Sequence, residues 1–160
     1  MVRRHSFVLI ILDGWGEAPE GRGNPLKLKN LPFWSMVRRS YPFLKLRASG
    51  IDVGLPKGQA GNSEAGHMNL GAGRIVSQDA VVISKSIANG TFFKNKALTA
   101  ALAHVKKTGG SFHLMGIVSG RESPHMDPDH VTALISFAKN AGIKKVWFHA
   151  FTDGRDSYYK

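Results

Sequence analysis

The sequence contains no cysteine among its 160 residues. Disulfide bonds, thiol chemistry and cysteine-based zinc sites are therefore excluded, which suits a reducing compartment. Long apolar runs are missing as well. The run at residues 7–12 is too short for a signal-peptide core or a membrane span, and it ends at Asp13. We therefore expect a soluble, cytoplasmic protein with no membrane partner.

Acidic residues are scarce, because 11 Asp and Glu face 22 Lys and Arg, a formal net charge of +11. Such a chain attracts anions. The basic residues are scattered along the chain without a dense tract, and no nucleic-acid-binding motif stands out. Small phosphorylated substrates and a merely solvated basic surface both remain open, and nucleic acid is not an expected partner.

The order of the apolar segments predicts an α/β fold, in which strands and helices alternate with short connections. A continuous apolar run predicts a buried parallel strand at residues 7–12. Further strands are expected at residues 44–48, 112–118 and 146–151. Helices are expected at residues 33–39, 75–89 and 95–107, and from Asp127-Pro128 to Gly142.

Two of the expected strands run directly into Asp-Gly, at Asp13-Gly14 and at Asp153-Gly154. In open α/β sheets, ligands bind beyond the carboxyl ends of the strands. Asp13 therefore stands where a metal ligand or a catalytic carboxylate belongs. A plain turn is the alternative, since Asp-Gly is a common turn dipeptide.

A glycine-rich segment, residues 50–73, surrounds one serine in Gly61-Asn62-Ser63-Glu64-Ala65-Gly66-His67. Glycine lets other backbone or a ligand come close, so a loop here would present the Ser63 hydroxyl. Glycine and asparagine are also common turn residues, and the spacing alone does not decide between the two interpretations.

Several stretches together resemble one family, the cofactor-independent (2,3-bisphosphoglycerate-independent) phosphoglycerate mutases. The resemblance runs from about residue 7 to the C-terminus. It rests on Leu12-Asp13-Gly14-Trp15-Gly16, Val53-Gly54-Leu55-Pro56, Gly61-Asn62-Ser63-Glu64-Ala65-Gly66-His67, Asn69-Leu70-Gly71-Ala72-Gly73-Arg74, His113-Leu114-Met115-Gly116 and His149-Ala150-Phe151-Thr152-Asp153-Gly154-Arg155-Asp156, in this order.

The resemblance implies the front part of an alkaline-phosphatase-like domain, interrupted by the opening part of an inserted α/β transferase domain. Residues 1–76 would belong to the metal-binding domain and residues 77–160 to the inserted substrate-binding domain. The family's other metal ligands are expected outside this chain. The chain alone is therefore expected to be inactive, and the full-length protein is expected to be a monomer.

The same resemblance implies roles for single residues. Asp13 matches a ligand of one of two divalent ions, usually Mn2+ in bacterial members, and Ser63 matches the nucleophile that also coordinates that ion. His125, Arg155 and Asp156 match substrate-holding residues. The implied reaction interconverts 3-phosphoglycerate and 2-phosphoglycerate through a phosphoserine, without 2,3-bisphosphoglycerate as a cofactor; no role carries over to His67.

These roles agree with the chemistry of the residues. A serine hydroxyl is a weak nucleophile at neutral pH, and a bound dication lowers the pKa of an oxygen ligand. Phosphoryl transfer relies mainly on positioning and charge, and arginine suits bidentate binding of carboxylate or phosphate.

One loop departs from the family. The usual Ser-Asp-Gly-Gly-Val-His-Ser-His is replaced here by the longer Ser119-Gly120-Arg121-Glu122-Ser123-Pro124-His125-Met126-Asp127. Two alternatives therefore stay open. One is another phosphatase or phosphomutase of the alkaline-phosphatase superfamily; the other is a non-catalytic remnant that binds anions or nucleic acid.

Overall fold

The computed structural model describes residues 6–28, 31–121 and 123–156. The chain divides into two compact units, Met1–Arg47 and Ala48–Lys160. The domain boundary expected after residue 76 concerns the inserted domain, and it stays a prediction. Each unit is described by itself below.

The first unit holds two helices, α1 (Pro25–Leu28) and α2 (Pro32–Ser40). The helix expected at residues 33–39 is confirmed as α2, and Pro32 occupies its first turn, where the missing N–H costs nothing. The rings of Trp15 and Trp34 meet edge to face at 5.4 Å. Arg38 in α2 forms an ion pair with Glu17 at 3.2 Å, and this contact connects the loop before α1 to α2.

The strands expected at residues 7–12 and 44–48 do not form, so these two predictions are wrong for this structure. Both segments lack strand pairing, and their apolar side chains are exposed, with Phe7 at 86% and Leu44 at 83%. The physical reason is that a strand needs a hydrogen-bonded neighbour, and the described part of the first unit contains no strand that could pair with either segment.

The second unit begins with a short 3-10 helix, η1 (Gly50–Val53), and the helix α3 (Ser63–Ala72). Val53, Leu55 and Ala65 form a small buried cluster that holds α3 against the preceding segment. The glycine-rich stretch is therefore not one long loop, because its second half is helical.

The helices of the remaining chain are α4 (Asp79–Ala88), η2 (Phe92–Lys94), α5 (Lys96–Thr108) and α6 (Pro128–Asn140). The helices expected here are confirmed, although α4 begins four residues later than expected. The caps agree with the sequence: Asn95 accepts hydrogen bonds from the first turn of α5, and Asp127 does the same for α6.

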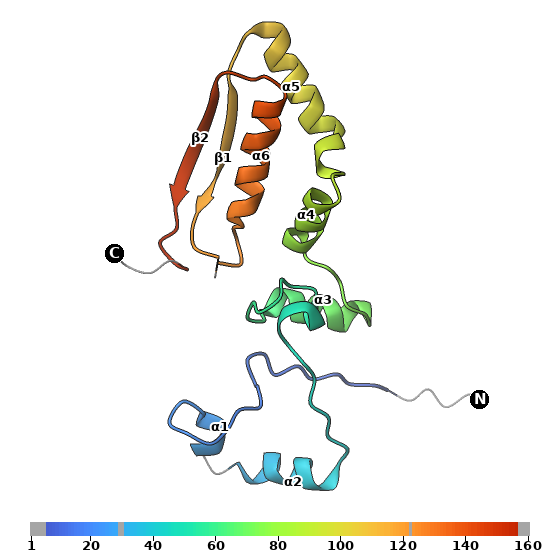
Figure 1. Ribbon diagram of the computed structural model, residues 1–160. Helices are drawn as coiled ribbons and strands as arrows, with labels where there is room; N and C mark the ends of the chain where they lie inside the picture. Colours follow the sequence, from blue (N-terminus) through green and yellow to red (C-terminus); the bar gives the residue numbers. More distant parts are fainter. Residues whose placement is uncertain (1–5, 29–30, 122, 157–160) are drawn as a thin grey trace, which may run out of the picture. The chain divides into compact units, whose positions relative to one another are not determined.

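Two parallel strands, β1 (Phe112–Val118) and β2 (Val146–Thr152), form the sheet, and both strands are confirmed. Phe112 pairs with Val146, and Val118 pairs with Thr152. The two strands therefore end at the same edge, and α6 connects them and runs beside β1 (Figure 1). Leu114, Ala133 and Ala138 are buried in this mixed α/β part.

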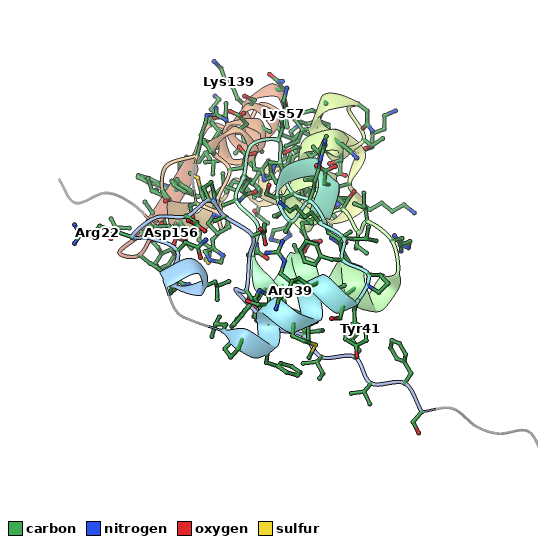
Figure 2. The ribbon with its side chains drawn as sticks, turned by 90° about the horizontal axis from the view of Figure 1, so that it is seen from below. Arg22, Arg39, Tyr41, Lys57, Lys139 and Asp156 are labelled. Carbon is green, nitrogen blue, oxygen red and sulfur yellow. The ribbon has the colours of Figure 1, made fainter. Side chains whose placement is uncertain are left out.

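The cationic side chains are dispersed, as the sequence indicates. Arg22, Arg39, Lys57 and Lys139 are exposed and come from different segments (Figure 2). Within the described residues, no helix has both the length and the apolar character needed to cross a membrane.

Candidate functional site

Ser63 is the first residue of α3, and its side chain is exposed. The first turn of a helix carries backbone N–H groups without intrahelical partners and the positive end of the helix dipole. Negative charge on the Ser63 oxygen, or on a phosphoryl group attached to it, is stabilised at such a position. Ser63 thus lies at a helix start rather than in a plain surface turn, and its role as the nucleophile stays a prediction.

Two neighbours fix the start of α3. Asn62 is the N-cap, and its Oδ1 accepts a hydrogen bond from the Ala65 backbone N–H at 2.9 Å. His67, one turn further on, has its Nδ1 at 2.7 Å from the Ser63 carbonyl oxygen. Because a carbonyl oxygen only accepts, Nδ1 carries the proton. His67 therefore holds the backbone of this turn.

Glycines let backbone segments meet around α3. A Cβ added to Gly61 would lie 1.8 Å from the Ala48 carbonyl oxygen, and one added to Gly54 would lie 1.9 Å from the Val76 carbonyl oxygen. Gly54 also has a φ of +77°. The expectation that glycine permits close backbone approach is therefore confirmed at these two positions.

Asp13 lies in the first unit and begins a turn. The Trp15 backbone N–H donates to the Leu12 carbonyl oxygen at 3.1 Å, and Gly14 adopts a φ of +74°. The turn expected from Asp-Gly is present. The role of Asp13 as a metal ligand stays a prediction.

His125, Arg155 and Asp156 come together beyond the carboxyl ends of β1 and β2. His125 Nε2 lies 3.8 Å from Asp156 Oδ2, and Arg155 Nε lies 3.8 Å from Asp156 Oδ1. The Asp156 side chain is 22% exposed, whereas that of Arg155 is 85% exposed. The arrangement offers an anchored carboxylate as an acceptor and an open guanidinium for an anion.

Sequence reasoning gave no role to the three residues that support this cluster, Ser119, Ser123 and Asp153. Ser119 Oγ donates to Asp153 Oδ2 at 2.6 Å, and Ser123 Oγ donates to Asp156 Oδ2 at 3.3 Å. The Asp-Gly at the end of β2 was the one signal that could have pointed to Asp153.

A pocket of about 520 Å³ lies against the loop whose sequence departs from the family pattern, here called the departing loop, with described residues 119–121 and 123–127. Lys57 and Gln59 line it from the segment before α3, and Arg121, Ser123 and Asp127 line it from the loop and the start of α6. Its lining mixes apolar side chains with polar ones and includes two cations, Lys57 and Arg121, and one carboxylate, Asp127.

Arg121 anchors the departing loop to α6. Its guanidinium donates two hydrogen bonds to the Asp129 carboxylate, at 2.8 and 3.0 Å. This hydrogen bonding and the charge of Arg121 lower the pKa of Asp129 from its ordinary value, and Asp129 raises the pKa of Arg121 in return. Because both side chains are exposed, the ion pair contributes little to the free energy of unfolding. Its main effect is to hold Arg121, and with it the loop, next to the first turn of α6.

We expect the Asp129 carboxyl to titrate below the range of an ordinary aspartate, and the variant Arg121→Gln to return it to that range. A pKa lowered by folding means that the stabilisation is present above the unfolded pKa and is lost as the pH falls through the folded pKa. Carboxyl carbon chemical shifts followed by NMR measure the midpoint. Asp79, an exposed aspartate in the first turn of α4, is the control. A midpoint that Arg121→Gln leaves unchanged would contradict the pairing.

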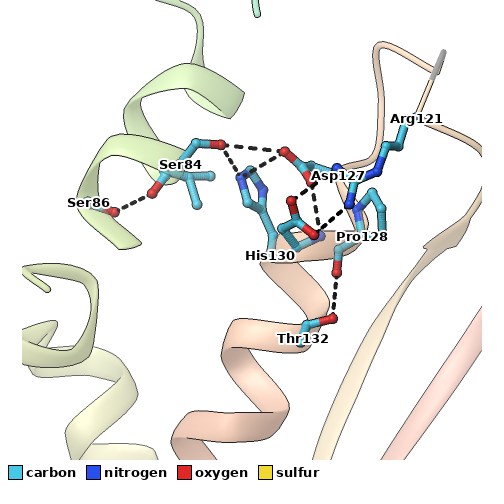
Figure 3. A network of polar contacts seen from close by, with 9 residues as sticks. Ser84, Ser86, Arg121, Asp127, Pro128, His130 and Thr132 are labelled. Atoms are coloured by element: carbon cyan, nitrogen blue, oxygen red, sulfur yellow. Dashed lines mark hydrogen bonds and ion pairs between the residues drawn. The ribbon is translucent and has the colours of Figure 1, made fainter. Parts of the chain in front are cut away.

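A serine, a histidine and an aspartate also meet between α4 and α6 (Figure 3). Ser84 Oγ lies 2.8 Å from His130 Nε2 and donates to Asp127 Oδ2 at 3.5 Å. His130 Nε2 also lies 3.6 Å from Asp127 Oδ2. The three side chains therefore join α4 to the start of α6.

In the part of the chain that the structure describes, few metal-binding side chains come together. No group of three or more His, Cys, Asp or Glu able to hold a metal ion occurs among the described residues. The two expected ligands, Asp13 and Ser63, offer a carboxylate and a hydroxyl oxygen, donors that suit hard divalent ions such as Mn2+ or Mg2+. The donor chemistry thus fits the expected ion.

A family model described as the N-terminus of BPG-independent PGAM (iPGM_N) matches residues 83–160. The chain is also similar to three relatives with the printed name 2,3-bisphosphoglycerate-independent phosphoglycerate mutase. The protein of Methanococcoides burtonii is 50% identical over 154 residues, that of Moorella thermoacetica is 50% identical over 150 residues, and that of Clostridium perfringens strain SM101 is 48% identical over 153 residues.

These matches cover 94% to 96% of this chain but only 29% to 30% of each relative. The chain therefore spans about 30% of the length of the curated relatives that it matches. The resemblance seen in the motifs is thus confirmed over nearly the whole chain, including the residues before the family-model match.

Proposed function

Since this chain belongs to the family of the 2,3-bisphosphoglycerate-independent phosphoglycerate mutases, as the counterpart of their N-terminal portion, we propose that it supplies the nucleophile and part of the substrate-holding site for the interconversion of 3-phosphoglycerate and 2-phosphoglycerate. The observation that carries the proposal is the meeting of His125, Arg155 and Asp156 at the carboxyl ends of β1 and β2, despite the altered loop.

In the proposed reaction, Ser63 Oγ attacks the phosphorus of 3-phosphoglycerate. The new bond joins Ser63 Oγ to phosphorus, and the bond from phosphorus to the 3-oxygen of the substrate breaks. The position of Ser63 at the start of α3 supports this role, because backbone N–H groups and the helix dipole favour the negative phosphoryl group there. The proton of the Ser63 hydroxyl ends on the 3-oxygen of the glycerate, which stays bound. Its 2-hydroxyl oxygen then attacks the same phosphorus, the bond between phosphorus and Ser63 Oγ breaks, and the proton of the 2-hydroxyl returns to Ser63 Oγ.

His125, Arg155 and Asp156 hold the glycerate between the two transfers in this proposal. The exposed Arg155 guanidinium binds the substrate carboxylate or phosphate, and the anchored Asp156 carboxylate accepts from substrate hydroxyls. Holding the intermediate in place replaces an encounter in solution by a step within one complex. If glycerate were released, water would hydrolyse the phosphoserine instead.

Asp13 and Ser63 are also proposed as ligands of divalent metal ions, which fits their oxygen donors. A bound dication would neutralise phosphoryl charge and lower the pKa of the serine hydroxyl. We also propose the domain organisation of the family for this chain. The segment around Ser63 would belong to an alkaline-phosphatase-like domain, and the part around the sheet would belong to the domain inserted into it.

The 160 residues alone are expected to bind 3-phosphoglycerate weakly and to show no mutase turnover with Mn2+, because most of the relatives' length is not in them. NMR titration with 3-phosphoglycerate should shift the amides of Arg155 and Asp156, and a coupled assay for 2-phosphoglycerate should stay at background. Turnover by the isolated chain would refute the expected inactivity.

Ribose 5-phosphate provides the comparison for the alternative enzyme class. Tighter binding of ribose 5-phosphate than of 3-phosphoglycerate, measured from the amide shifts of Arg155 and Asp156, would favour another phosphomutase of the alkaline-phosphatase superfamily. Binding of RNA or DNA that depends steeply on salt would favour the non-catalytic alternative. The basic residues are spread along the sequence without a dense tract, which does not favour that outcome.

A further inference from the structure

Asp153, the residue after the end of β2, closes a turn with one carboxylate oxygen. Its Oδ1 accepts hydrogen bonds from the backbone N–H groups of Arg155 at 2.8 Å and Asp156 at 3.0 Å. Aspartate side chains that bond to the backbone two and three residues further on fix local turns. One side-chain oxygen therefore supports the backbone that carries Arg155 and Asp156.

The second oxygen of the same carboxylate joins this turn to the other loop. Asp153 Oδ2 accepts from the hydroxyl of Ser119 at 2.6 Å. Ser119 is the first residue after β1, and both serine and aspartate are half-buried. This length is usual for a hydroxyl that donates to a carboxylate, a type of hydrogen bond that is stronger than one between neutral groups. Asp153 thus couples the ends of both strands.

A second serine completes the connection on the departing loop. Ser123 is only 3% exposed. Its hydroxyl donates to Asp156 Oδ2 and accepts from the His125 backbone N–H, each at 3.3 Å. A continuous set of hydrogen bonds therefore links Ser119, Asp153, Asp156, Ser123 and His125.

We propose that Asp153 is a positioning residue, which places Arg155 and Asp156 opposite His125 before substrate arrives. This inference rests on the proposed function for its substrate. The Arg155 side chain is mostly exposed and meets Asp156 only at 3.8 Å, so side-chain contacts hold it weakly. Its location is set through the backbone, and Asp153 anchors that backbone. Binding energy is then not consumed in ordering the turn.

The test compares Asp153→Ala with Asp153→Asn in the 160-residue chain. Alanine removes both acceptors. Asparagine keeps an oxygen for the two backbone N–H groups, and its amide can donate to Ser119, whose hydroxyl can also accept. Ser119→Ala removes the hydroxyl that joins Asp153 to the end of β1. Asp79→Ala, at the exposed start of α4, is the control for the loss of one carboxylate.

Two readouts are needed, hydrogen exchange at the amides of Arg155 and Asp156 without ligand, and the affinity for 3-phosphoglycerate from an NMR titration. Asp153→Ala should speed exchange at both amides and weaken binding, each by about tenfold or more, because hydrogen bonds to a charged acceptor are lost. Asp153→Asn should restore both values to within about threefold of the unmodified chain. Asp79→Ala should change neither.

Unchanged exchange at both amides in Asp153→Ala overturns the inference, and so does unchanged affinity when the unmodified chain binds 3-phosphoglycerate. If the unmodified chain shows no binding, the proposed function fails, and exchange alone then decides whether Asp153 fixes the turn. Should Asp153→Ala not fold, as judged from the amides of β2, Ser119→Ala decides. Weaker binding by a few-fold supports the inference, and unchanged binding overturns it.

Discussion

Replacing Ser63 with alanine is expected to lower mutase turnover by more than about a thousandfold, because the proposed path transfers the phosphoryl group to the Ser63 oxygen and back. Alanine removes that oxygen and leaves the rest of α3 in place, since the N-cap side chain belongs to Asn62. The measurement requires a hybrid protein, in which this chain is followed by the remaining length of the M. burtonii relative. The 50% identity over 96% of the chain supports this choice.

The matched control is Ser136→Ala, which removes an exposed hydroxyl from α6. It should leave turnover of the hybrid within about twofold, as is usual for surface substitutions away from a site. A hybrid with Ser63→Ala that retains turnover near the unmodified level would contradict the assignment of the nucleophile. Loss of turnover in both variants would point to a folding defect of the hybrid instead.

Replacing Gly61 with alanine is expected to destabilise the segment that presents Ser63 by about 3 kcal/mol. The new Cβ would lie 1.8 Å from the Ala48 carbonyl oxygen, which is backbone and cannot rotate away. The segment would have to separate or shift. Hydrogen exchange at the amides of Gly50 and Leu55, which are bonded within this segment, should then accelerate by roughly a hundredfold.

Gly66→Ala is the control for this prediction. Gly66 lies in the middle of α3, and an added Cβ would meet nothing within 4 Å. Alanine is favoured over glycine in a helix by about 1 kcal/mol, so this variant should slow exchange or leave it unchanged. Equal effects of the two substitutions would show that the close approach of Gly61 and Ala48 does not matter.

Helices and strands whose ends are set by residues close in the sequence could be predicted from the sequence. Asn95 begins α5 and Asp127-Pro128 begins α6, as their side chains indicate. Both strands of the sheet agree with their apolar runs to within one residue. Caps and apolar periodicity act over a few residues, so no knowledge of distant contacts was needed for these elements.

Residues 7–12 and 44–48 show the limit of that approach. Their patterns indicate a tendency to form strands, but pairing depends on partners elsewhere, and the described structure provides none in their unit. The helix around Ser63 was missed for a different reason. Glycines such as Gly66 disfavour a helix, but the Asn62 cap and the complete burial of Ala65 outweigh their propensity.

The site was predicted in the same uneven way. The resemblance identified His125, Arg155 and Asp156, and the structure brings them together. The hydrogen bonds of Ser119, Ser123 and Asp153 join residues about 33 to 34 positions apart in the chain. Such pairs carry no local signal, because any serine can bond to any nearby carboxylate once the loops are placed.

The most direct test of the proposed function is to locate the phosphoryl group during turnover. The unmodified hybrid protein is mixed with 3-phosphoglycerate labelled in its phosphate, quenched in acid and digested, and its peptides are analysed by mass spectrometry. The proposal predicts label on the oxygen of Ser63, in the peptide that contains the start of α3, and none there in the Ser63→Ala variant. Turnover with label on another residue, or with no labelled protein at all, would contradict it.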